Sequence, residues 1–135
     1  MDSAVIQQSA RATLEGTKPF PAIVADLISA GVEYYHVDYI GRCFSYYGFA
    51  GDRVVAPIDY EGLPAVAADF EASALKAAIH DSQRNGQKYR DFSRRAMSAG
   101  VQGYMAFLRG KRVVYIGRQG DLHTEWFPGA QPTKP

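Results

Sequence analysis

Two histidine–carboxylate pairs carry the residue types that acid–base chemistry needs. His36 and Asp38 are two residues apart in a segment rich in β-formers, and His123 and Glu125 repeat that spacing near the end of the chain. Residues i and i+2 of a strand share one face and lie about 7 Å apart, so each pair brings a base beside a carboxylate. Convergence of both pairs would give a small acid–base or metal-assisted enzyme, whereas separate pairs are ordinary polar neighbours on a solvated sheet face.

Aromatic residues are the second group that could form a site. The chain has nine tyrosines and one tryptophan in 135 residues. Some of these tyrosines must fill the core with their hydroxyls satisfied, and others can line a pocket for a planar or sugar-like ligand. Our candidates for such a pocket are Tyr39, Tyr47 and Trp126. The single cysteine, Cys43, has no base fixed near it by the sequence, and we expect a small buried residue there.

The net charge of +1 hides an uneven distribution of charged residues. Residues 76–118 contain ten basic and two acidic residues, whereas the remainder contains five basic and twelve acidic ones. One explanation is that two solvated faces of opposite charge attract each other within one fold. Another is that the oppositely charged ends of separate molecules associate. The third interpretation is a basic surface for an anionic partner, with candidates Arg84, Lys88, Arg90, Arg94 and Arg95. No sequence motif supports it, so nucleic acid is not an expected partner.

An internal repeat at an offset of 69 residues supplies the elements that must position these side chains. Residues 29–52 and 98–121 align without a gap and are identical at ten of 24 positions, four of which are glycines. Turn glycines are hard to match by coincidence because their backbone conformations are specific. The repeat does not duplicate the histidine–carboxylate pairs, since Met105 and Phe107 stand at the positions that match His36 and Asp38.

Each repeat has the same predicted order of elements. Apolar residues at helical spacing indicate two helices in each copy, at residues 3–15, 20–28, 71–84 and 89–97. Gly31 and Gly100 suit left-handed positions just after the second helix of each copy. Runs rich in β-formers follow, at residues 34–40, 43–47 and 53–58, and at residues 103–109, 112–116 and 122–127. Gly41-Arg42 and Gly110-Lys111 favour two-residue hairpin turns with glycine first.

We therefore predict one α+β domain over residues 1–135, an internal duplication of a helix–helix–three-stranded antiparallel meander unit. Its two copies are related by pseudo-twofold symmetry, and their helices pack on antiparallel sheet, because one copy alone is too small to bury its elements. The predicted parts are a first repeat at about 3–58, a connector at 59–70, a second repeat at about 71–128 and a loose tail at 129–135. The sequence leaves open whether the two sheets join edge to edge or pack face to face.

A family resemblance rests on short motifs of glycines and aromatic residues. They are Ala30-Gly31-Val32, Tyr46-Tyr47-Gly48, Ala99-Gly100-Val101 with Tyr104, Tyr115-Ile116-Gly117 and residues 120–128. With these motifs the chain resembles the YbcV-like family, small bacterial proteins of unknown function of which some are labelled phage envelope proteins. The resemblance runs from the first helix to Pro128 and implies a phage-related origin. It carries over no catalytic residue.

Our interpretation is a binding or interaction domain, without a cofactor or bound metal, whose partner is a protein, a small molecule or a second copy in a homodimer. No run approaches the roughly 18 apolar residues of a membrane span, and the start of the chain lacks the features of a signal peptide. We therefore expect a cytoplasmic protein without a membrane partner. The alternatives are the enzyme described above and nucleic-acid binding through the basic second repeat.

Overall fold

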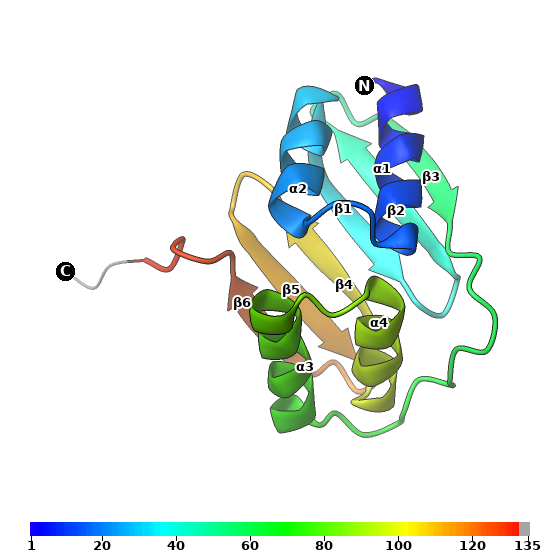
Figure 1. The fold of residues 1–135 in the computed structure, drawn as a ribbon, viewed down its shortest axis with the longest axis vertical. Helices are drawn as coiled ribbons and strands as arrows, with labels where there is room; N and C mark the ends of the chain where they lie inside the picture. Colours follow the sequence, from blue (N-terminus) through cyan, green and yellow to red (C-terminus); the bar gives the residue numbers. More distant parts are fainter. Residues whose placement is uncertain (133–135) are drawn as a thin grey trace.

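Two helix pairs lie on one face of a six-stranded antiparallel sheet in the computed structural model, which describes residues 1–132 (Figure 1). The first repeat contributes α1 (Ser3–Glu15), α2 (Phe20–Ser29), β1 (Val32–Asp38), β2 (Cys43–Gly48) and β3 (Arg53–Pro57). The second repeat contributes α3 (Ala72–Asn85), α4 (Tyr89–Ser98), β4 (Val101–Phe107), β5 (Arg112–Gly117) and β6 (Leu122–Trp126). Equivalent elements begin 69 residues apart throughout, which confirms the predicted α+β duplication.

The two three-stranded units join edge to edge. The strand order is β3-β2-β1-β4-β5-β6, and β1 and β4 form the antiparallel seam between the repeats. At this seam His36 pairs with Met105, its own equivalent at the offset of 69 residues, so the pseudo-twofold axis passes between these two residues. Each helix pair covers its own half of the sheet, α1 and α2 above and α3 and α4 below (Figure 1).

Local signals end the helices where the sequence predicts. The side chain of Asp2 caps α1 by accepting a hydrogen bond from the backbone N–H of Val5, and Gly16 ends that helix in the left-handed conformation. Gly31 and Gly100, which follow the second helix of each copy, have φ angles of 90° and 93°. Residues other than glycine rarely adopt this conformation, so the two glycines stop the helices and turn the chain into β1 and β4.

The predicted two-residue hairpin turns are wrong. Four residues join β1 to β2 and β4 to β5, because the last pairs in the ladders are Asp38 with Cys43 and Phe107 with Arg112. The left-handed residue is the fourth of each loop, Arg42 at φ 57° and Lys111 at φ 54°, and not the glycine before it. The expected strands at 34–40 and 103–109 therefore begin and end two residues earlier than predicted.

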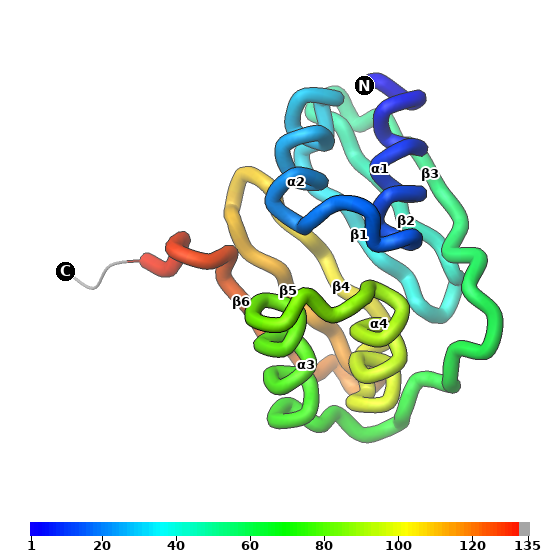
Figure 2. The backbone as a smooth tube through the Cα atoms, in the orientation of Figure 1, coloured from blue at the N-terminus to red at the C-terminus, as the bar shows by residue number. Residues whose placement is uncertain are grey.

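The connector between the repeats follows the outside of the molecule from β3 to α3 (Figure 2). It forms no helix or strand in the described residues, but it is anchored at several points. The backbone N–H of Ala67 donates to the carbonyl of Met97, the side chain of Arg118 donates to the carbonyl of Val66, and Val66 is buried. These hydrogen bonds fix the connector to the end of α4 and to the turn between β5 and β6.

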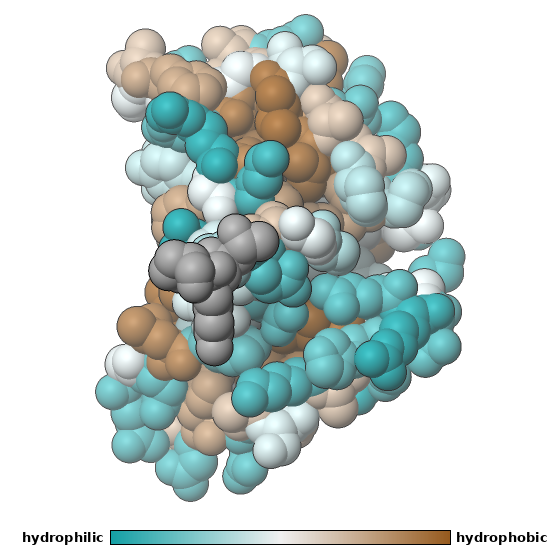
Figure 3. Space-filling model, turned by 90° about the vertical axis from the view of Figure 1, so that its left-hand side faces the viewer, coloured by the Kyte–Doolittle hydropathy of each residue, from teal (hydrophilic) through white to brown (hydrophobic). Residues whose placement is uncertain are grey.

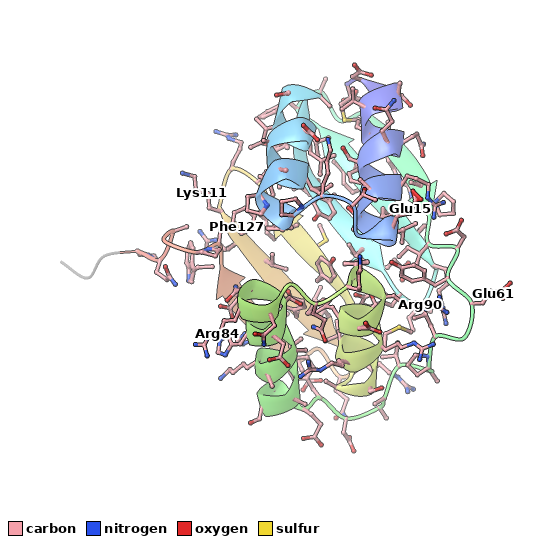
Figure 4. The ribbon with its side chains drawn as sticks, viewed as in Figure 1. Glu15, Glu61, Arg84, Arg90, Lys111 and Phe127 are labelled. Carbon is pink, nitrogen blue, oxygen red and sulfur yellow. The ribbon has the colours of Figure 1, made fainter. Side chains whose placement is uncertain are left out.

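The chain is anchored just before the predicted loose tail and at its start. The ring of Phe127 meets that of Phe20 edge-on at 5.2 Å, beside the start of α2 (Figure 4). The backbone N–H of Phe127 donates to the carbonyl of Lys111, and a turn bond joins Ala130 to Phe127. The last part of the predicted tail, residues 133–135, lies outside the described residues.

The hydrophobic core lies between the helices and the sheet. Its largest fully buried side chains include Tyr39, Tyr46, Phe44, Leu27 and Leu75. Within residues 1–132 no helix covers the other side of the sheet, which is the far side in Figure 1. We call this uncovered side the open face. On the side of the molecule where β6 lies, apolar residues gather over α2 and hydrophilic residues over α3 (Figure 3), in keeping with the basic second repeat.

Candidate binding site on the open face

The strand register sorts the side chains of the open face into three rows. Tyr35 and Val37 of β1 are buried beneath the helices, so Tyr34, His36 and Asp38 point to the open face. Directly paired residues of antiparallel strands share a face, so each of these three belongs to a row that crosses all six strands. The row through Tyr34 we call the aromatic row; it consists of Arg53, Tyr47, Tyr34, Phe107, Arg112 and Trp126.

The other two rows have different chemistry. The central row, through His36, consists of Val55, Ser45, His36, Met105, Val114 and Thr124. The far row, through Asp38, consists of Pro57, Cys43, Asp38, Gly103, Ile116 and Leu122. The pseudo-twofold axis exchanges the aromatic row with the far row, so each residue of one has its equivalent in the other. Four of the six residues of the aromatic row are aromatic, and the far row has none.

The aromatic row contains two separate stacks. In the first, the ring of Tyr34 lies 5.0 Å from that of Tyr47 at an interplanar angle of 19°, and 5.8 Å from that of Phe107 at 31°. In the second, the guanidinium of Arg112 lies over the ring of Trp126 at 4.1 Å. Offset aromatic stacking and cation–π contact both hold these side chains on the surface of the sheet.

A shallow depression of about 520 Å³ lies where the two stacks meet. It is lined by residues from both stacks and from the β4–β5 hairpin: Glu33, Tyr34, Phe107, Arg109, Gly110, Arg112 and Val114. Arg109 forms an ion pair with Glu33 at 3.1 Å, and its guanidinium lies 5.6 Å from the centre of the Phe49 ring. We call this depression the slot; it combines a flat aromatic wall with hydrogen-bond donors and one carboxylate.

The two histidine–carboxylate pairs do not converge. His36 and Asp38 lie on the open face, whereas His123 and Glu125 pair with Tyr115 and Val113, which are buried on the helix side. The sheet therefore stands between the pairs, and three strand spacings, about 14 Å, separate β1 from β6 along it. The four-residue site of the alternative enzyme interpretation is not formed, because the alternation along β6 directs the side chain of His123 to the helix side of the sheet.

Each pair has a local role instead. The Oδ1 atom of Asp38 accepts hydrogen bonds from the backbone N–H groups of Ile40 and Gly41, at 3.0 and 2.9 Å, and so fixes the β1–β2 turn. His123 Nε2 lies 3.2 Å from Glu125 Oε1, and the imidazole stacks on the ring of Tyr115. Among residues 1–132 no three His, Cys, Asp or Glu side chains are grouped so that they could hold a metal ion.

The three aromatic candidates have different surroundings. Tyr39 is only 1% exposed, and its hydroxyl donates to Ser93 at 3.1 Å inside the core. Burial raises its pKa to about 12. Tyr39 is therefore a core residue and does not contribute to the open face. Tyr47 and Trp126 do lie on the open face, in the aromatic row. Cys43 is also on this face and partly exposed, where the sequence analysis expected a buried residue.

The basic candidates of the second repeat belong to the helix layer. Arg84 projects from α3 and Arg90 from the start of α4, on opposite sides of that layer (Figure 4). Arg90 lies over the Tyr60 ring and donates to the carbonyl of Glu61, and Arg95 pairs with Asp81 at 2.5 Å. Arg94 lies on α4, and Lys88 immediately precedes that helix. These five residues do not contribute to the open face.

Sequence reasoning missed the residues that complete the aromatic row, namely Tyr34, Phe107, Arg53 and Arg112. The strand period alone puts Tyr34 on the face of His36, so part of the signal was present. The predicted two-residue turn would have paired Tyr34 with Phe49 and set Tyr47 beside His36. The four-residue turn shifts this register by two residues and brings Tyr34 opposite Tyr47.

The comparisons with known proteins add no assignment to this geometry. No protein-family model matches the chain, and no curated protein is significantly similar to it in sequence. The resemblance to the YbcV-like family therefore stays a prediction from the motifs. In the part of the chain that the structure describes, none of the helices combines the length and the apolar character that crossing a membrane requires.

Proposed function

We propose that the protein is a binding domain whose slot receives a planar aromatic ring that carries negative charge. The observation that carries this proposal is the pair of stacks in the aromatic row, which face each other across a depression. A planar ring in the slot would continue the series of rings that ends at Phe107 and would meet the guanidinium of Arg112 on its other side. The cytoplasmic location and the phage-related origin stay predictions from the sequence and lend no support here.

The polar groups of the slot suit a ring with both donors and an anionic substituent. Arg109 and Arg112 offer charged donors to a phosphate or carboxylate, and Glu33 offers an acceptor to ring N–H groups. A nucleotide combines these features in one ligand: a planar base with N–H donors and a phosphate. The slot is shallow, and its lining shows no pair of groups arranged for nucleophilic or acid–base catalysis, so the proposal is binding rather than turnover.

The intrinsic fluorescence of the protein tests this proposal directly. Trp126 is the one tryptophan of the chain and belongs to the second stack. We expect titration with guanosine or adenosine monophosphate to change its emission, whereas ribose 5-phosphate, which has the charge without the ring, has little effect. Phe107→Ala should weaken binding about tenfold or more, since stacking of a base on an aromatic side chain is worth roughly 1–3 kcal/mol.

The repeat provides a matched control for this experiment. Ile116 stands on the same face in the far row, at the position equivalent to Tyr47, so Ile116→Ala removes an apolar side chain outside the slot. It should leave the fluorescence titration as it is. Circular dichroism of both variants checks that they are folded. The proposal fails if neither mononucleotide changes the Trp126 emission or the amide signals of the aromatic row in NMR spectra.

A further inference from the structure

We infer that the natural ligand of the open face is a single-stranded nucleic acid that lies along the aromatic row, across the strands of the sheet. This inference rests on the proposed function, because one base of the strand occupies the slot. It goes further in assigning the rest of the row to neighbouring nucleotides. The basic residues of the second repeat form no nucleic-acid motif, but the aromatic row is drawn from both repeats and its arginines come from β3 and β5.

The length of the row exceeds what one small ligand can use. Six strands at a spacing of about 4.8 Å make a row of roughly 24 Å. Arg53 and Arg112 are four strand spacings apart, about 19 Å, and a single nucleotide in the slot cannot contact both. The ring of Tyr34 is covered by Tyr47 on one side and by Phe107 on the other. A strand of several nucleotides can therefore place bases at the two ends of this stack, in the slot and beside Arg53, while its phosphates reach both guanidinium groups. Stacking platforms lined by basic side chains are the usual design for single-strand binding.

The charges on the open face favour one row for an anionic strand. Among the described residues whose side chains point to this face from a strand, both arginines lie in the aromatic row. The carboxylate of Asp38 lies in the far row and is occupied by its own turn. Beside the slot, Arg109 is paired with Glu33, and the exposed Lys111 adds a further positive charge on the β4–β5 hairpin. A polyanion is therefore attracted to the aromatic edge of the face and not to its opposite edge.

A single strand fits this surface better than a duplex or a second copy. In a duplex the flat faces of the bases are covered by their neighbours, and within residues 1–132 the open face has no protruding helix or ribbon that could enter a groove. Two open faces packed on each other would form a sandwich with an apolar interior about 10 Å thick. Such packing would bury Arg53, Arg112 and His36 of both copies, and unpaired buried charge is costly.

Fluorescence anisotropy with labelled single-stranded oligonucleotides tests the inference. Affinity should rise with oligonucleotide length, within the range of about 4 to 16 nucleotides that single-strand sites span. A plot of the logarithm of the binding constant against that of the salt concentration should have a slope near −1.4, because two phosphate contacts contribute about −0.7 each. A duplex of the same sequence should bind more weakly than the single strand.

Arg53→Ala separates strand binding from occupation of the slot. Arg53 lies far from the slot, so its loss should weaken oligonucleotide binding more than mononucleotide binding and should make the salt slope shallower by about 0.7. Leu122→Ala is the matched control, because Leu122 is the repeat-equivalent of Arg53 in the far row and is exposed. This control should leave both the length dependence and the salt slope unchanged.

Three outcomes would overturn the inference, and they are distinguishable from one another. If mononucleotides change the Trp126 emission but longer strands bind no more tightly, the strand path is wrong and the proposed function stands. If neither ligand binds, both fail. If light scattering shows a dimer that Tyr34→Lys dissociates, while oligonucleotides do not bind, the open face is an interface between copies of the chain.

Discussion

The aromatic row and the far row occupy equivalent places on one backbone and carry different side chains. The pseudo-twofold axis between His36 and Met105 maps Tyr34 onto Gly103 and Tyr47 onto Ile116. The hairpins and bulges that support the two rows are the same in both repeats. The sheet therefore offers two geometrically equal positions for a site, and only one of them has rings and arginines. The difference shows that the duplicated backbone positions a surface and that the unmatched side chains decide what it binds.

Under the helices the two repeats are alike. Repeat-equivalent positions such as Tyr35 and Tyr104, or Tyr46 and Tyr115, are buried in both halves. Packing constrains such residues in both copies because each faces the same helix layer. On the open face no such constraint acts, and the two copies differ there. Variants at equivalent positions can therefore measure how far the equivalence of the two repeats extends.

The largest expected effect separates the two helix-ending glycines. Gly31 and Gly100 have the same left-handed conformation, but an added Cβ at Gly100 would lie 2.3 Å from the carbonyl oxygen of Asp69, whereas at Gly31 its nearest neighbours are 3.6 Å away. Gly100→Ala should lower the free energy of unfolding by about 3 kcal/mol, and Gly31→Ala by about 1–2 kcal/mol, in urea denaturation. Equal losses would show that the connector does not restrict the second repeat.

The next effect concerns Gly103, the residue of the far row that is equivalent to Tyr34. The seam leaves no room for a side chain at this position. A Cβ at this residue would lie 2.5 Å from the carbonyl oxygen of Val37 and 3.2 Å from Nε2 of His36. Gly103→Ala should destabilise the protein by about 2 kcal/mol, because the seam between β1 and β4 must shift to admit it. Thermal and urea denaturation measure this loss. A loss below about 0.5 kcal/mol, the size of an ordinary surface substitution, would contradict this account of the asymmetry.

A smaller effect, of opposite sign, is expected at the hairpins of both repeats. Arg42 and Lys111 adopt positive φ angles that cost most residues other than glycine roughly 1 kcal/mol. Arg42→Gly and Lys111→Gly should each stabilise the fold by about 0.5 kcal/mol, after the greater entropy of the unfolded glycine chain is subtracted. Gly110→Ala serves as the control, since Gly110 has no positive φ. Stabilisation at only one hairpin would show that the two loops are strained unequally.

The smallest effect is a pH dependence of the stability, to which one ion pair in each half of the chain should contribute. Hydrogen bonds from Arg11 hold the pKa of Asp59 below its ordinary value of 3.8, and Arg95 does the same for Asp81. Because these pKa values are lower in the folded than in the unfolded state, the stabilisation is present above about pH 4 and disappears as the pH falls through the folded values. Both carboxylates are exposed, so the decrease in Tm on acidification should be slight.

Variants that cannot titrate isolate this contribution. Asp59→Asn and Asp81→Asn should each flatten the decrease in Tm between pH 5 and pH 2, and the double variant should flatten it further. Calorimetry at several pH values measures the change. A wild-type Tm that rises on acidification below pH 4 would contradict the direction of both pKa shifts.

Local signals in the sequence were enough to predict most of the fold. The helix periodicity, the glycines after the helices and the offset of 69 residues located every helix and strand to within a few residues. These features depend on neighbours along the chain, such as the left-handed backbone that Gly31 and Gly100 supply. The hairpins were predicted less well, because Arg42 and Lys111 occupy a conformation that their residue types do not signal.

The candidate site could be predicted only in part. Tyr47 and Trp126, two of the predicted ligand-binding candidates, lie in the aromatic row. Tyr39 is a core residue, because it continues the alternation of β1 on the side of Tyr35 and Val37, where its hydroxyl donates to Ser93. His36 and His123 could not be assigned to opposite faces without the parity of β6 in the assembled sheet.

By itself, the sequence determined the elements of this protein, their order and their duplication, since these follow from short-range spacing and turn residues. Only the tertiary structure decided which side chains meet. Tyr34 and Phe107 become neighbours because β1 and β4 pair at the seam, and Arg112 meets Trp126 because β5 and β6 pair in one register. Such pairings join residues far apart in the chain, and a register shift of two residues leaves the hydrophobic pattern of each strand unchanged while it changes every neighbour across the sheet.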